Sequence, residues 1–197
     1  ALCGAPRHDD DHPRKAVACA LEMQLAMARV NDRSRLAGLP EVEMGIALNT
    51  GEVVVGNIGS EKRTKYGAVG RHVNLTSRME SYSRGGQILV SASTRDRVGD
   101  VLEIRGEITA EFKGSADPVT IFDVGGLRSP YELRLPERSP EDWRLPATPV
   151  PVCFRVFAGK SKRGPVHMGA IAALTRRCAR IESPHFIAPF EDVEVRL

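Results

Sequence analysis

A cluster of prolines near position 140 constrains this chain more than any other feature. Six of the 13 prolines fall between Pro130 and Pro151. Proline lacks a backbone N–H and fixes φ, so neither a central strand nor an uninterrupted helix can pass through such a segment. We therefore predict a semi-rigid linker at 129–149, between a first domain at 1–128 and a small second domain at 150–197.

Composition excludes several classes of protein. The chain has 197 residues, of which 42% are hydrophobic and 27% charged, as in ordinary globular proteins. Apolar runs stay far below the roughly 20 residues that span a bilayer, so we expect no membrane segment in this chain and a cytoplasmic location. A net charge of only +3 argues against a nucleic-acid partner. The four cysteines are widely spaced, which favours free thiols in a reducing compartment.

The first region alternates between helical and strand patterns. An apolar stripe at +4, +3, +4 and +3 spacing predicts a helix over 13–36, with Ala16, Ala20, Met23, Met27 and Val30 facing the core. Further helices are predicted at 71–83 and 91–98. Strands are predicted at 42–48, 52–58, 66–69, 87–90, 101–113 and 119–124, with a hairpin at Thr50 and Gly51. Interleaved helices and strands indicate an α+β sheet domain.

The tail has a different pattern, with short apolar runs at 152–157, 169–174, 179–181 and 193–197. Short alternating runs of this kind predict a small all-β barrel or sandwich. Residues 150–197 also hold eight Lys or Arg against four Asp or Glu, so the positive charge is concentrated there.

Two polar residues of the predicted helix at 71–83 are candidates for chemistry. Asn74 and Arg78 are four residues apart, so they share one helix face. Arginine presents a planar fork of donors that suits phosphate, and asparagine can donate to and accept from a sugar oxygen. Together they could hold a ribose phosphate. The alternative from spacing alone is a solvated helix face.

At this point the sequence resembles the class III nucleotidyl cyclases, which are adenylate and guanylate cyclases. The resemblance rests on the run NTGEVVVGNIG at 49–59, YGAVG at 66–70 and VNLTSRME at 73–80. It continues through 85–90, 113–114 and 118–119, and covers residues 1 to about 126. It implies a ferredoxin-like βαββαβ fold whose domains pair head to tail, as a homodimer or with another cyclase domain, with the active sites at the interface.

The resemblance also implies an activity and the residues that perform it. In the family the ribose 3′-oxygen attacks the α-phosphate of ATP or GTP and pyrophosphate leaves. Asn74 matches the asparagine that orients the ribose, and Arg78 matches the arginine that stabilises the pentavalent phosphate. Lys113 matches a lysine that contacts the triphosphate. Two Mg or Mn ions are held by two aspartates of the opposite subunit, and they activate the nucleophile. We expect cyclic AMP as the product in signal transduction.

Three positions depart from the family pattern. Neither metal-binding aspartate has a match in this chain, because both belong to strands that would precede Ala1, so no metal ligand is assigned. Gly67 occupies the position that reads the purine edge and brings no side chain. Arg71 stands where Asp or Asn is common. The chain starts with Ala, so we expect it to be a truncated part of a longer cyclase. We also expect the isolated chain to be inactive.

The tail resembles a PilZ domain, a β barrel that binds cyclic di-GMP. The three signature positions read Ala173, Thr175 and Cys178, so the ligand residues are degenerate. For the first domain an alternative function stays open, in which it is a catalytically inactive dimerisation partner or a nucleotide-sensing module.

Overall fold

The computed structural model describes residues 1–60, 63–110, 118–137, 143–158, 162–175, 178–187 and 193–197. The chain divides into two compact units, Ala1–Pro136 and Glu137–Leu197. Within the described residues, no helix is long and apolar enough to cross a membrane.

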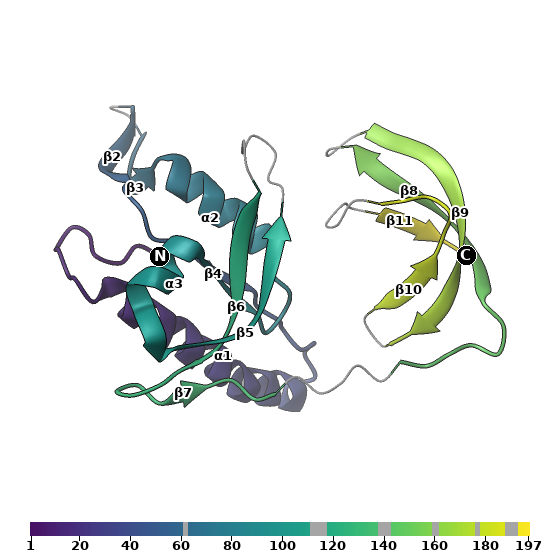
Figure 1. Cartoon of the computed structure of the whole chain (residues 1–197), viewed down its shortest axis with the longest axis horizontal. Helices are drawn as coiled ribbons and strands as arrows, with labels where there is room; N and C mark the ends of the chain where they lie inside the picture. Colours follow the sequence, from purple (N-terminus) through teal and green to yellow (C-terminus); the bar gives the residue numbers. More distant parts are fainter. Residues whose placement is uncertain (61–62, 111–117, 138–142, 159–161, 176–177, 188–192) are drawn as a thin grey trace. The chain divides into compact units, whose positions relative to one another are not determined.

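The first unit is built on one mixed sheet (Figure 1). Its strands run in the order β1 (Ile46–Leu48), β4 (Ile88–Ser91), β6 (Val119–Leu127) and β5 (Leu102–Ala110). β1 and β4 are parallel, whereas β4 pairs antiparallel with β6 and β6 with β5. The short strand β7 (Leu133–Arg134) extends the pairing of β6. Helices α1 (His12–Leu36), α2 (Arg71–Ser81) and α3 (Ala92–Val98), followed by the 3-10 turn Gly99–Val101, complete the unit. The predicted α+β class is confirmed.

The alternation of side chains in β4 separates two cores. Ile88 and Val90 point to one face of the sheet, where α1 and α3 pack, and Leu89 points to the other, where α2 packs. The α1 face buries twelve residues in one cluster. The α2 face buries only four, which are Met79, Leu89, Ala110 and Ile121. The functional candidates of α2 therefore lie on the less deeply packed side of the sheet.

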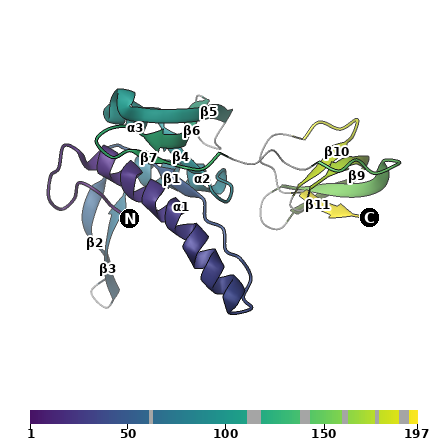
Figure 2. The same cartoon turned by 90° about the horizontal axis from the view of Figure 1, so that it is seen from below.

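Helix α1 confirms the predicted helix and the burial of Ala20, but it corrects the rest of the predicted core face. Val17 and Leu21 are fully buried, while Met23 is 46% exposed and Val30 44% exposed. All the buried residues of this 25-residue helix lie in its first ten positions. Met23 is exposed because its neighbour Gln24 faces the adjoining backbone instead, donating to Met44 O and Gln87 O. Figure 2 shows the second half of α1 continuing beyond the sheet. The side chain of Asn31 connects that half to the segment between α1 and β1, because it donates to Val42 O and accepts from Val42 N.

The predicted hairpin at Thr50 and Gly51 is wrong. β1 pairs in parallel with β4, and β2 (Val54–Ser60) pairs antiparallel with β3 (Arg63–Val69) in a separate two-stranded ribbon. The chain leaves the main sheet after Leu48 because Ile46 and Leu48 pack into the α1 core, whereas β2 carries no fully buried residue. Figure 1 shows the ribbon standing off the sheet next to α2.

The predicted linker begins too early. Residues up to Pro136 belong to the first unit, because β7 pairs with β6 and Leu135 is buried in the α1 core. Arg134 also forms two hydrogen bonds with Glu103 of β5, at 2.9 and 2.8 Å. Prolines here bound a short strand and do not prevent it. Residues 138–142 of the predicted linker lie outside the described residues.

The second unit contains a four-stranded antiparallel sheet. Its order is β10 (Ala179–Glu182), β9 (Lys162–Leu174), β8 (Val150–Ala158) and β11 (Val193–Arg196). The expected β content is present, but the described strands form an open sheet in which β10 and β11 are edges, not a closed barrel. Buried Val152, Phe154, Ile171 and Ala173 form the apolar centre.

Candidate active site

Helix α2 presents Asn74 and Arg78 on its exposed side. Apolar residues at 75, 79 and 82 turn toward the sheet, and Met79 is fully buried against Leu89 and Ile121. Asn74 and Arg78 therefore lie on the outward face, both exposed, as the i, i+4 spacing predicts. Among the described residues, neither side chain has a hydrogen-bond or ion-pair partner. Their polar groups are available to a ligand.

The base of α2 is a sharp turn at Gly70. This residue has φ of 146°, a backbone conformation that residues other than glycine rarely adopt. The turn links β3 directly to the helix, so Gly67 and Asn74 are kept within a short stretch of chain. Gly67 lies opposite Gly56 across the ribbon, and a methyl group added at Gly67 would meet only Ile58 Cδ1, at 3.7 Å. Lys113 lies outside the described residues.

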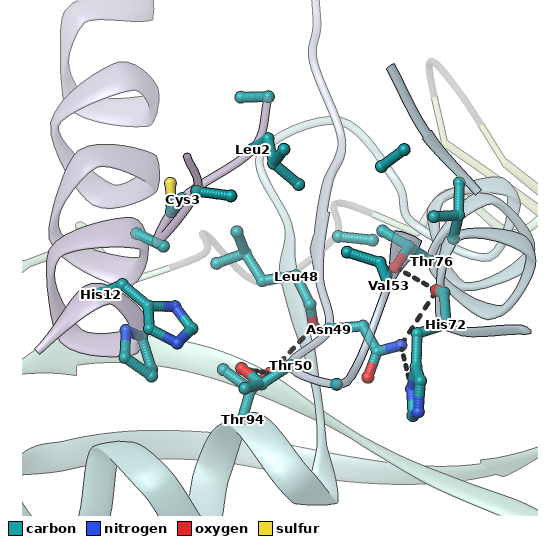
Figure 3. A pocket seen from close by; sticks show the side chains of 18 of the residues that line it. Leu2, Cys3, His12, Leu48, Asn49, Thr50, Val53, His72, Thr76 and Thr94 are labelled. Carbon is teal, nitrogen blue, oxygen red and sulfur yellow. Dashed lines mark hydrogen bonds between the residues drawn. The ribbon is translucent and has the colours of Figure 1, made fainter. Parts of the chain in front are cut away.

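A cavity of about 840 Å³ opens between the first residues of the chain, α1, the end of β1 and α2 (Figure 3). Its wall includes Leu2, His12, Leu48, Gly67 and Thr76. Asn74 and Arg78 do not line it, because they project from a different side of α2. The structure thus brings Gly67 to the cavity and leaves the two candidate catalytic residues outside it.

A polar network not predicted from the sequence lies at the edge of this cavity. Asn49 Nδ2 donates to the backbone oxygen of His72 at 3.0 Å and lies 3.4 Å from His72 Nδ1. Ser93 Oγ lies 2.7 Å from Thr50 O and 3.3 Å from Asn49 Oδ1, so its single proton is shared between these two acceptors, of which Thr50 O is the nearer. His72, at the start of α2, is half-buried. The sequence signal was an asparagine followed by Thr-Gly directly after a strand.

The acidic residues before α1 are engaged with neighbouring side chains. Lys15 Nζ donates to Asp9 at 2.7 Å, and this hydrogen bond lowers the pKa of Asp9 below its usual 3.8. Tyr131 donates to Asp11, and burial together with this bond raises the pKa of Tyr131. In the portion of the chain that the structure describes, no group of three or more His, Cys, Asp or Glu side chains could hold a metal ion.

The chain was then compared with known proteins. Positions 1–122 match the family model of the adenylate and guanylate cyclase catalytic domain. The chain belongs to this cyclase family. Adenylate cyclase 1 of Rhizobium meliloti (strain 1021) is 33% identical over 129 residues, which are 64% of this chain and 19% of that protein. An adenylate cyclase of Mycobacterium tuberculosis (strain ATCC 25618 / H37Rv) is 39% identical over 115 residues, or 57% of this chain and 25% of the relative.

Solved cyclase structures have the same fold. The guanylyl cyclase Cya2 is 55% identical with a TM-score of 0.66, and the alignment covers 68% of each chain. The adenylyl cyclase CyaB from P. aeruginosa is 33% identical with a TM-score of 0.59, over 64% of this chain and 66% of that one. The chain spans a quarter or less of the two curated relatives described above, and about two thirds of these cyclase structures.

Proposed function

We propose that this chain supplies the ribose- and phosphate-binding half of a nucleotidyl cyclase site. The observation that carries the proposal is the pair Asn74 and Arg78, exposed and unpartnered on one face of α2 within the described residues. In the reaction, the 3′-oxygen of a nucleoside triphosphate loses its proton and forms a bond to the α-phosphorus. The bond from that phosphorus to the bridging oxygen breaks, and pyrophosphate leaves with the electron pair.

Each residue has one role in this scheme. Arg78 directs its guanidinium N–H groups at the phosphate oxygens as negative charge develops, so it acts on turnover more than on substrate binding. Asn74 holds the ribose by donating to and accepting from its oxygens. Gly67 lies against the purine, and Lys113 contacts the triphosphate.

The ribbon formed by β2 and β3 supports pairing with a second cyclase domain. It exposes Val54 (70%), Tyr66 (53%), Val69 (46%) and Ile58 (39%). A two-stranded ribbon of this kind is marginally stable alone, and exposed apolar side chains on it favour burial against a partner. We propose a head-to-tail arrangement, either of two copies or of this chain with another cyclase domain.

Metal ligands in this arrangement come from the other domain. Because the two aspartates of the family pattern have no match in this chain, we propose that two copies of it alone would form two half-sites without ligands for Mg or Mn. We therefore propose that the isolated chain does not turn over substrate. We propose that activity requires a domain that brings the aspartates.

The test is complementation. The chain is mixed with a cyclase domain that keeps its metal-binding aspartates but has lost its own asparagine and arginine, and cyclic nucleotide is measured with Mg or Mn. We expect activity in the mixture and none in either component alone. Arg78→Ala should abolish it, whereas Arg29→Ala, which changes an exposed arginine of α1, should not. Activity that survives Arg78→Ala would contradict the proposal.

ATP and GTP are both supplied in that assay. We propose cyclic AMP as the main product, which agrees with the names of the curated relatives, although the 55% identical structure is a guanylyl cyclase. Binding of a non-hydrolysable nucleotide without turnover in the mixture would favour the inactive sensing module.

For the second unit we propose a PilZ-like domain with a degenerate ligand site. Thr175 and Cys178 close the turn between β9 and β10, through Thr175 N to Cys178 O at 2.8 Å and Cys178 N to Thr175 Oγ1 at 2.8 Å. Titration with cyclic di-GMP tests this unit, and we expect no binding at micromolar concentrations, because Ala173 and Cys178 lack the polar groups of the signature.

A further inference from the structure

The first half of α2 is less deeply packed than the second, because Leu75 is only partly buried against the core on this face of the sheet. Its N-cap is Gly70, which has no side chain to bond the free N–H groups of the first turn. The one fully buried residue of the helix is Met79, near its other end. Asn74 lies in the half that has only the partly buried Leu75 and the bond from Thr76 Oγ1 to His72 O at 2.7 Å, so further contacts there help to fix its position.

Asn49 provides those contacts from the chain that follows β1 (Figure 3). Its Nδ2 donates to His72 O at 3.0 Å, in the first turn of α2. Its Oδ1 lies 3.3 Å from Ser93 Oγ, in the first turn of α3, and shares the proton of that hydroxyl with Thr50 O at 2.7 Å. Both ends of one amide are used, and each joins a different helix.

The other surfaces of this contact are rigid. A methyl group added at Gly51 would lie 2.3 Å from His72 Nδ1, so the imidazole ring rests directly on the backbone there. On the α3 side, Thr94 and Val98 are buried, and Ser91 caps the helix by accepting from Thr94 N. Asn49 thus connects the start of α2 to a helix that is fixed in the core.

We propose that Asn49 is a positioning residue that holds the first turns of α2, and with them Asn74, in the orientation needed for cyclisation. It does not touch substrate. This inference rests on the proposed function, since it assigns Asn49 a role in a reaction that Asn74 serves. Removing the amide should displace Asn74 more than Arg78, because Arg78 is next to the buried Met79.

The first experiment uses the whole chain and does not need activity. Hydrogen exchange is measured for the amides of residues 73–76 and 78–81. In Asn49→Ala, and in Asn49→Asp, which keeps the shape but lacks the donor, we expect about tenfold faster exchange at 73–76 only. Asn31→Ala is the matched control, since Asn31 also makes two hydrogen bonds but at the far end of α1. Unchanged exchange at 73–76 would overturn the proposal.

If the Asn49→Ala variant does not fold, the Ser93→Ala variant is measured in its place. It removes the α3 side of the connection and leaves Asn49 in place. We expect faster exchange at 73–76 by a smaller factor. No acceleration at all would again overturn the proposal.

The second experiment separates positioning from general destabilisation. In the complementation assay, Asn49→Ala should lower kcat about tenfold with little change in KM. In an Asn74→Ala background the same change should lower kcat less than about twofold, because the residue it positions is gone. An equal loss in both backgrounds would show a purely structural role. A wild-type mixture without activity would overturn the proposed function and the catalytic meaning of Asn49 together, whatever the exchange result.

Discussion

Two faces of the same sheet differ in what holds them together. The α1 face joins two helices, three strands and Leu135 in one apolar cluster, whereas the α2 face has four buried residues and a polar connection through Asn49. Burial supplies stability in proportion to the apolar area removed from water. The comparison indicates that the α1 face contributes most of the apolar stabilisation of the domain, whereas the lightly packed helix α2 carries the proposed substrate-binding residues on its outward side.

Leu21→Ala should have the largest effect and defines the stabilising face. Leu21 is fully buried on α1, so its truncation should cost about 2–5 kcal/mol of unfolding free energy. Met23→Ala, two residues later and 46% exposed, should change it by less than about 0.5 kcal/mol. Urea unfolding of both variants checks this contrast. Equal losses would mean that Met23 is also buried in solution.

Arg78→Ala should show the opposite behaviour. We expect at least about 100-fold lower kcat in the complementation assay, because a donor aimed at developing phosphate charge is lost. Its unfolding free energy should stay within about 0.5 kcal/mol of wild type, since the side chain is exposed. Loss of stability without loss of turnover would reverse the assignment of the two faces.

Ser91→Ala should have a moderate effect. Its hydroxyl accepts from Thr94 N at 3.2 Å and caps α3, so removal should cost about 1 kcal/mol. Thermal unfolding measures the loss, and Ser81→Ala serves as a control because its hydroxyl bonds only within the last turn of α2. If the Ser91 variant were as stable as wild type, the inference that the cap at Ser91 fixes α3 in the core would be wrong.

The smallest effect concerns pH. Arg134 holds the pKa of Glu103 below its usual 4.5, chiefly through a side-chain hydrogen bond. A lowered pKa in the folded state means that this contribution is fully present above pH 4.5 and is lost as pH falls through the folded pKa. The difference in melting temperature between wild type and Glu103→Gln should therefore shrink from pH 6 to pH 3. A constant difference would mean that the pair contributes nothing.

Much of this arrangement follows from sequence pattern. Period-3.6 spacing predicted α1 within one residue at its start, and the same spacing predicted that Asn74 and Arg78 share a face. Local periodicity does not say which side of a helix its neighbours cover, so it wrongly assigned Met23 to the core. It also cannot pair strands 40 residues apart, which is why the parallel partner of β1 was missed.

The polar network was beyond prediction for a similar reason. Asn49 bonds residues 23 and 44 positions away, and no local pattern marks those partners. What the sequence showed was the residue type and its place after a strand. Three-dimensional packing decided that its amide would face two helix starts.

The bare position at Gly67 has an evolutionary consequence. Its backbone is not in a glycine-only conformation, and a side chain there would meet only one methyl group at an ordinary contact distance. Glycine within a strand also costs about 0.5–1 kcal/mol relative to alanine. A single codon change could therefore introduce a new group beside the proposed purine position without rebuilding the ribbon. Choice between nucleotides at this site would then be open to selection in one mutational step.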